Sequence, residues 1–131
     1  MRRRIGAAVL LALLAPVFVG CTPGGELPRS GPLAMYPRTD AGMDALFEGT
    51  LRLIDGCVVV EAPEGLLVLP VFPSGDASWS DGILMWRDHE YLDGDAISLG
   101  GGGGGGPVGS TSTAYIPEDC VGLSAWWVSP Y

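Results

Sequence analysis

A chain of 131 residues with a formal net charge of −8 has room for a single domain and is too acidic to favour nucleic acid as a partner. It contains one His and no Lys, Asn or Gln, which excludes a phosphate-binding lysine, a Schiff-base lysine and a metal site built from several histidines of one chain. Its hydrophobic content of 47% is enough to bury a core.

Residues 1–20 are predicted to be a bacterial lipoprotein signal peptide. Three arginines at positions 2–4 form a positive start, and the apolar run from Ile5 to Val19 is too short to span a bilayer comfortably. Gly20 then precedes Cys21, the residue predicted to carry the lipid, although Phe18 stands where such motifs usually have Leu. An ordinary secretory signal and an uncleaved anchor are the alternatives.

Residues 21–43 are predicted to be a lipid-anchored flexible stalk that precedes a domain at residues 44–131. The stretch from Thr22 to Thr39 is rich in Pro and Gly and poor in apolar residues, as tethers are. About 24 such residues reach an r.m.s. distance of roughly 27 Å, so the domain is expected just clear of the outer face of the cell membrane. Without the signal, four arginines face fifteen acidic residues, a net charge of −11.

Two cysteines remain besides Cys21, and they are predicted to form a structural disulfide between Cys57 and Cys120, because exported proteins mature in an oxidising compartment. Closing a loop of about 64 residues stabilises a domain by roughly 4 kcal/mol in the chain-entropy model. A redox pair is the alternative, but redox cysteines usually lie close together in the sequence, as in Cys-x-x-Cys.

The first two strands are predicted to pair as a hairpin. From Leu46 to Ile54 apolar and polar residues alternate, which is typical of a half-buried strand. Asp55-Gly56 follows, and then the β-branched run from Cys57 to Val60. Asp-Gly between two strand patterns indicates a type I′ turn, so the two strands are expected to be antiparallel.

Later strands are separated by turn residues. A third strand is predicted at Leu66–Val71, ended by Pro70 and Pro73, which cannot donate to a sheet. Ser74–Asp81 is predicted to be a loop, and the seven-glycine run Gly100–Gly106 a mobile loop. Further strands are predicted at Ile83–Trp86, Ala96–Leu99 and Ser124–Val128, the last as an edge or closing strand, with a single helical turn at 41–47 or 117–121.

Together these patterns predict an all-β domain: a small five- to six-stranded antiparallel barrel, OB-like, with one disulfide. Small sheets usually close into a barrel because closure removes the exposed edge strands. A small sandwich is the alternative.

Five motifs of turn glycines, strand-ending prolines and cysteines occur along the chain: Gly49-x-Leu51, Gly56-Cys57-Val58, Leu69-Pro70-Val71-Phe72-Pro73, Gly94-Asp95-x-Ile97-x-Leu99-Gly100-Gly101 and Ile116-Pro117-x-x-Cys120. With them the chain resembles small secreted or lipid-anchored proteins of GC-rich actinobacteria. The resemblance covers most of the mature domain and implies a two-cysteine β domain in an extracytoplasmic compartment. It implies no catalytic residue, because the function of those proteins is uncharacterised.

The densest polar cluster is Asp88–Asp95, whose four carboxylates could bind Ca²⁺. Its spacing is not that of an EF-hand, and a hairpin turn with solvated charges is the simpler interpretation, so no metal site and no cofactor are predicted. A hydrolase built on His89 and the serines around Trp79 lacks a nucleophile-elbow motif.

Four tryptophans are many for so small a domain. Trp126 and Trp127 must point to opposite faces of a strand, so they cannot both fill one core. Trp79 and Trp127 are the candidates for a binding face, where Trp is favoured.

The function expected from these features is that of a non-enzymatic cell-envelope lipoprotein, a binding module for another envelope protein or a cell-wall component. Its contact with the membrane would be through the lipid on Cys21, and nucleic acid is not expected as a partner. A small-molecule or divalent-cation-binding module and a hydrolase are the alternatives; no motif supports the hydrolase.

Overall fold

A computed structural model describes residues 26–107, 109 and 113–131 of the chain. The predicted signal peptide and the lipidation residue Cys21 therefore lie outside the described residues. Within the described part the only helical element is one 3-10 turn, and no helix is long and apolar enough to cross a membrane. The elements in chain order are β1 (Ala34–Tyr36), β2 (Ala45–Ile54), β3 (Cys57–Glu61), β4 (Leu67–Pro73), β5 (Ala77–Ser80), β6 (Ile83–Trp86), β7 (His89–Tyr91), β8 (Ala96–Pro107), η1 (Glu118–Cys120) and β9 (Ser124–Val128).

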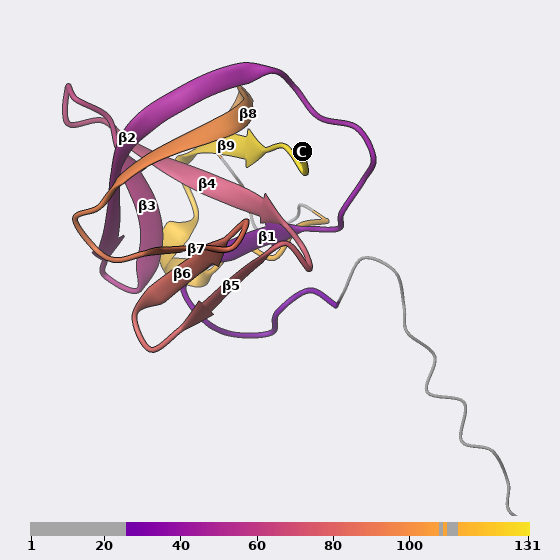
Figure 1. The fold of residues 1–131 in the computed structure, drawn as a ribbon, viewed down its shortest axis with the longest axis horizontal. Helices are drawn as coiled ribbons and strands as arrows, with labels where there is room; N and C mark the ends of the chain where they lie inside the picture. Colours follow the sequence, from indigo (N-terminus) through magenta and orange to yellow (C-terminus); the bar gives the residue numbers. More distant parts are fainter. Residues whose placement is uncertain (1–25, 108, 110–112) are drawn as a thin grey trace, which may run out of the picture.

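Five strands close into a barrel, as predicted (Figure 1). The order around the barrel is β2-β3-β4-β9-β8, and β8 pairs with β2 to complete the ring. All of these pairs are antiparallel except β4–β9, which is parallel. Numbered along the chain, barrel strands one to five are β2, β3, β4, β8 and β9. Their order around the barrel is one-two-three-five-four, with the third and fifth strands parallel, which is the OB arrangement of a small Greek-key barrel. The prediction of a purely antiparallel barrel was wrong in this one pair.

The hairpin between β2 and β3 is confirmed with its predicted turn. Ile54 faces Cys57 across the turn, and the two residues between them have the positive φ angles that a type I′ turn requires, 50° at Asp55 and 80° at Gly56. The same two-residue geometry recurs at Asp81-Gly82 and at Arg87-Asp88.

Side chains alternate between the barrel interior and its outer surface. On β3, Val58 and Val60 belong to the inner cluster of buried residues, whereas Val59 belongs to a second cluster on the outside of the barrel. The inner cluster also contains Leu51, Phe72, Leu84 and Leu99. The outer cluster contains Cys57, Leu69, Val71, Cys120 and Ala125.

Residues 33–36, which the sequence analysis assigned to the flexible stalk, pack on both clusters: Leu33 and Met35 on the inner one, and Ala34 and Tyr36 on the outer one. Leu33, Ala34 and Met35 are 3%, 0% and 9% exposed, and β1 pairs in parallel with β4. The prediction of a stalk through residue 43 was therefore wrong for this stretch. The physical reason is that β3 pairs with β4 only as far as Val68, which leaves the rest of that edge of β4 free for β1.

The seven-glycine run is a strand and not the predicted mobile loop. β8 continues through it to Pro107, and Gly101, Gly102 and Gly103 face Val128, Trp127 and Trp126 of β9. A side chain at Gly101 would overlap the backbone carbonyl of Trp127. Glycine is thus required here for the close approach of β8 to β9.

A second, three-stranded sheet of order β5-β6-β7 fills the connection between β4 and β8 (Figure 1). The predicted strand Ile83–Trp86 is confirmed, but it lies in this small sheet and not in the barrel. The predicted loop Ser74–Asp81 contains β5, because Trp79 and its neighbours pair with β6. Leu84 and Trp86 point into the inner cluster and close one end of the barrel.

Candidate functional site

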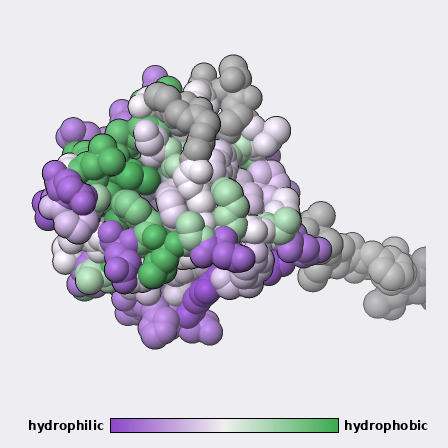
Figure 2. Space-filling view, turned by 90° about the horizontal axis from the view of Figure 1, so that it is seen from above, coloured by the Kyte–Doolittle hydropathy of each residue, from purple (hydrophilic) through white to green (hydrophobic). Residues whose placement is uncertain are grey.

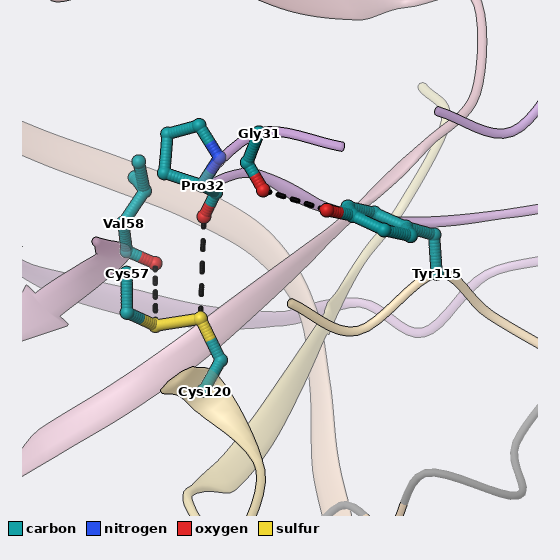
Figure 3. Close-up of a disulfide and its surroundings, with 6 residues drawn as sticks. All are labelled: Gly31, Pro32, Cys57, Val58, Tyr115 and Cys120. Atoms are coloured by element: carbon teal, nitrogen blue, oxygen red, sulfur yellow. Dashed lines mark hydrogen bonds between the residues drawn. A yellow bond between two sulfur atoms is a disulfide. The ribbon is translucent and has the colours of Figure 1, made fainter. Parts of the chain in front are cut away.

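The disulfide predicted between Cys57 and Cys120 is confirmed (Figure 3). The two Cα atoms are 5.4 Å apart and 63 residues apart in the sequence. The bond joins the start of β3, just after the first hairpin turn, to the end of η1. The Sγ atom of Cys120 lies 4.0 Å from the carbonyl oxygen of Pro32, so the segment before β1 packs directly on the bond.

A groove with a volume of about 490 Å³ lies beside this bond, open to solvent. It has three walls: the segment 30–32, the hairpin end of β2 and β3, and the chain around η1. The lining residues are Ser30, Gly31, Pro32, Leu53, Gly56, Tyr115, Pro117, Glu118 and Asp119. In an OB barrel the loops that bound such a position, together with the outer face of the second and third strands, commonly hold ligands.

Hydrogen bonds hold the first and third walls together. The Tyr115 hydroxyl donates to the carbonyl oxygen of Gly31 at 2.7 Å (Figure 3). The backbones of Tyr115 and Met35 exchange two further bonds, of 2.7 and 3.0 Å. Burial raises the pKa of the Tyr115 hydroxyl, so this donor stays protonated across the neutral range. With the disulfide holding the second wall to the third, all three walls are tied.

The groove has an apolar floor and an acidic rim. Leu53 on β2 is 42% exposed and contributes to the floor. Glu118 and Asp119 occupy the first turn of η1, and the Asp119 carboxylate lies over Gly56 so closely that a Cβ there would be 2.9 Å from Oδ2. Among the described lining residues none is basic. The arrangement suits a positively charged group with an apolar stem.

A second, smaller hollow of about 100 Å³ lies on the other side of the same segment. It is lined by Pro28, Ser30, Gly31, Pro32, Leu33, Met35 and Trp79. Ser30, Gly31 and Pro32 line both hollows, so the segment that leads into β1 forms the partition between them.

The two tryptophans proposed for a binding face lie in different surroundings. Trp79 is half-buried on the inner cluster and lines the smaller hollow. Trp127 is half-buried on the outer cluster, where its ring meets Tyr36 edge-on at 5.8 Å between centroids. Most of each ring is thus used in packing.

The acidic stretch 88–95 is a strand and a turn in which the carboxylates of Asp93 and Asp95 bind backbone amides. Asp95 accepts a hydrogen bond from the Leu92 amide at 2.8 Å, and Asp93 accepts one from Leu53 at 3.2 Å. His89 is exposed on β7. Across the described residues no group of three or more His, Cys, Asp or Glu is placed to hold a metal ion.

Apolar side chains also reach the surface outside the groove. On the face seen in Figure 2, hydrophobic patches are bordered by hydrophilic residues. Leu46 on β2 and Leu66 in the β3–β4 turn are the most exposed large apolar residues described, at 65% and 62%.

No protein-family model, no curated protein and no solved structure matches this chain. The resemblance to small actinobacterial proteins therefore stays a prediction from the motifs, and the site is argued from its own geometry.

Sequence reasoning missed two of the three groove walls. Segment 30–32 was hidden in a Pro- and Gly-rich stretch, and Tyr115 stands in a polar connection with no strand pattern. The one signal available was the apolar run Leu33-Ala34-Met35-Tyr36, which is unusual in a tether.

Proposed function

We propose that this chain is a cell-envelope lipoprotein, anchored through a lipid on Cys21, whose domain is a non-enzymatic binding module. Its site is the groove beside the disulfide, and its partner is an envelope protein that presents a basic side chain on an extended segment. One observation carries the proposal: an apolar floor and the carboxylates of Glu118 and Asp119 line one groove, two of whose walls are joined by a covalent bond.

A basic partner follows from charge complementarity. The mature chain carries a net charge of −11, and Glu118 and Asp119 bring part of that charge to the groove rim. Three of its four arginines are engaged elsewhere: Arg38 with Asp76, Arg52 with Asp93, and Arg87 with the ring of Trp86. An Arg or Lys side chain could lay its methylene stem on Leu53 and its charge between the two acids.

Binding is favoured over catalysis by the composition of the groove. Ser30 supplies a hydroxyl, but the described lining contains no His, Lys or free thiol that could activate it. Both cysteines nearby are oxidised. A groove with acids and no activated nucleophile is suited to holding a cation.

The groove is tested by two double variants of equal net charge. Glu118→Gln with Asp119→Asn removes the rim acids, whereas Glu64→Gln with Glu90→Gln removes two exposed acids on the β3–β4 turn and on β7. The probe is a five-residue peptide of alternating Ala and Arg, titrated calorimetrically into the mature full chain.

The rim variant is expected to bind the probe about tenfold more weakly, since a hydrogen bond to a charged group contributes roughly 1.5–3 kcal/mol. The matched variant is expected to bind like the native chain. If both variants bound the probe equally weakly, the affinity would depend on the total charge of the chain and not on the groove, and the assignment of the site would be wrong.

The anchor is tested separately by Cys21→Ala. This variant is expected to leave the membrane fraction, because one acyl-bearing residue is the proposed link to the bilayer. Continued retention of the variant in membranes would contradict lipidation at Cys21.

A further inference from the structure

The domain begins much closer to Cys21 than its Pro- and Gly-rich composition suggests. Leu27 already packs against the inner cluster of the barrel, and Pro28 lines the smaller hollow. From there the chain continues along the domain through Leu33 into β1. Residues 22–26 separate Cys21 from Leu27, which is the first residue of the described part that packs on the core.

Covalent geometry then limits how far the domain can stand from a lipid on Cys21. Six Cα-to-Cα steps lead from Cys21 to Leu27, and at about 3.6 Å each they reach no more than roughly 22 Å. As a flexible chain they would have an r.m.s. length of about 13 Å, half of the distance that a stalk through residue 43 would give.

This reach is shorter than the domain is wide. A globule of about 106 residues has a radius of gyration of about 13 Å, which corresponds to a diameter of roughly 33 Å. The link therefore cannot pass around the domain, and the side on which Leu27 lies must stay toward the bilayer. In Figure 1 the described chain starts on one side of the molecule and the β3–β4 turn lies on the opposite side.

The groove lies near the anchored side. Ser30 lines both hollows and is three residues after Leu27, so its Cα atom is within about 11 Å of that of Leu27. That bound is about one third of the domain's diameter of roughly 33 Å.

We infer that the lipid holds the domain directly on the membrane surface with the groove near the bilayer, so that the basic segment it binds is a juxtamembrane segment of a membrane protein. This inference rests on the proposed function for the lipid and for the groove. It differs from a module on a long tether, which would sample partners throughout the layer outside the membrane.

Energy transfer from tryptophan to a dansyl headgroup lipid tests the position of the domain. The lipidated full chain is placed in phosphatidylcholine vesicles beside a variant with twenty Gly and Ser residues inserted between Gly24 and Gly25. The insertion raises the r.m.s. link length from about 13 to about 28 Å, so transfer is expected to fall strongly. Trp79→Phe is made in both the native and the lengthened chain to report which side of the domain faces the bilayer. Trp79 is suited to this because it lines the same hollow as Pro28, close to the anchored end of the domain.

In the native chain Trp79→Phe is expected to remove more than one quarter of the transfer, since Trp79 is one of four tryptophans and the one that shares a hollow with Pro28. In the lengthened chain the same substitution should remove about one quarter of the transfer. Identical transfer in the native and lengthened chains would overturn the inference while leaving the anchor intact. Failure of the native chain to float with vesicles would instead overturn the lipid anchor itself.

The juxtamembrane partner is tested with the same Ala-Arg peptide carrying an acyl chain. Lengthening the link from six to twenty-six residues is expected to lower binding of the vesicle-held peptide by about ninefold, by the −3/2 power dependence of effective concentration on length. Binding of the free peptide should not change. An unchanged affinity for the vesicle-held peptide would contradict a site held at the bilayer.

Discussion

The glycine run of β8 yields a sharp prediction, because two adjacent glycines in the same strand differ in what surrounds them. At Gly101 a Cβ atom would overlap the carbonyl oxygen of Trp127 and lie 3.0 Å from Nε1 of Trp126, and the backbone φ is +155°. At Gly100 a Cβ atom would meet nothing within 4 Å. Alanine at the two positions should therefore have opposite effects on stability.

The magnitudes follow from the contacts. The carbonyl that Gly101→Ala would strike belongs to the backbone of β9, so relief requires β8 and β9 to separate where they pair. Overpacking typically costs 1–3 kcal/mol and an unfavourable backbone angle 1–3 kcal/mol, so a loss of about 3 kcal/mol is expected. Gly100→Ala is expected to gain roughly 0.5–1 kcal/mol, because it restricts the unfolded chain without a clash.

Urea unfolding followed by tryptophan fluorescence measures both variants, since Trp126 and Trp127 lie on the strand that faces the glycines. For a domain of this size a loss of 3 kcal/mol corresponds to a fall in Tm of at least about 12 °C. If Gly101→Ala were as stable as Gly100→Ala, close packing between β8 and β9 would not be the reason for glycine, and the assignment of the run as a strand of the barrel would be wrong.

Three further predictions concern the rest of the domain. Replacing Cys57 and Cys120 together by Ser should lower the free energy of unfolding by about 4 kcal/mol, measured in urea, because the unfolded chain loses a long closed loop; a loss below 1 kcal/mol would contradict that account. Burial, and then the charge of Asp76, raise the pKa of Tyr36, so the hydroxyl ionises in the unfolded chain before it does in the folded one, and the free energy of unfolding should fall as pH rises past about 10. In Tyr36→Phe, followed by thermal unfolding, this part of the fall should be absent. The variant also loses the hydrogen bond to the Val128 carbonyl oxygen, but it does so at every pH. Asp88→Gly should stabilise the β6–β7 hairpin by about 1 kcal/mol, because Asp88 has a φ of +63° in a type I′ turn; an unchanged denaturation midpoint would refute strain there.

Features that depend on neighbouring residues could be predicted from the sequence. The hairpin at Asp55-Gly56 follows from the turn residues and the strands on either side, and both were found where expected. The pairing of Cys57 with Cys120 followed from counting cysteines in a chain that was predicted to be exported. In each case the information lies in a few residues or in a count, so no knowledge of the packed barrel was needed.

Features that depend on distant strands could not be predicted. Gly101 is in a strand only because β9 approaches it closely, and a run of glycines contains no sequence signal for that neighbouring strand. β1 forms because β3 leaves part of the β4 edge unpaired, which is a property of the assembled barrel. The parallel pairing of β4 with β9 likewise appears only on closure.

The same tertiary contacts connect the proposed site with the route by which the chain would reach it. Two walls of the groove are joined by the bond between Cys57 and Cys120, which forms where thiols are oxidised. The third wall, at Gly31 and Pro32, is tied to Tyr115 and leads back toward Cys21, which lies ten positions before Gly31. A chain that is still reduced thus lacks the covalent link between two walls. The complete groove is consequently expected only in the oxidised protein, and the proposed anchor would place it at the membrane surface where the proposed partner segment lies.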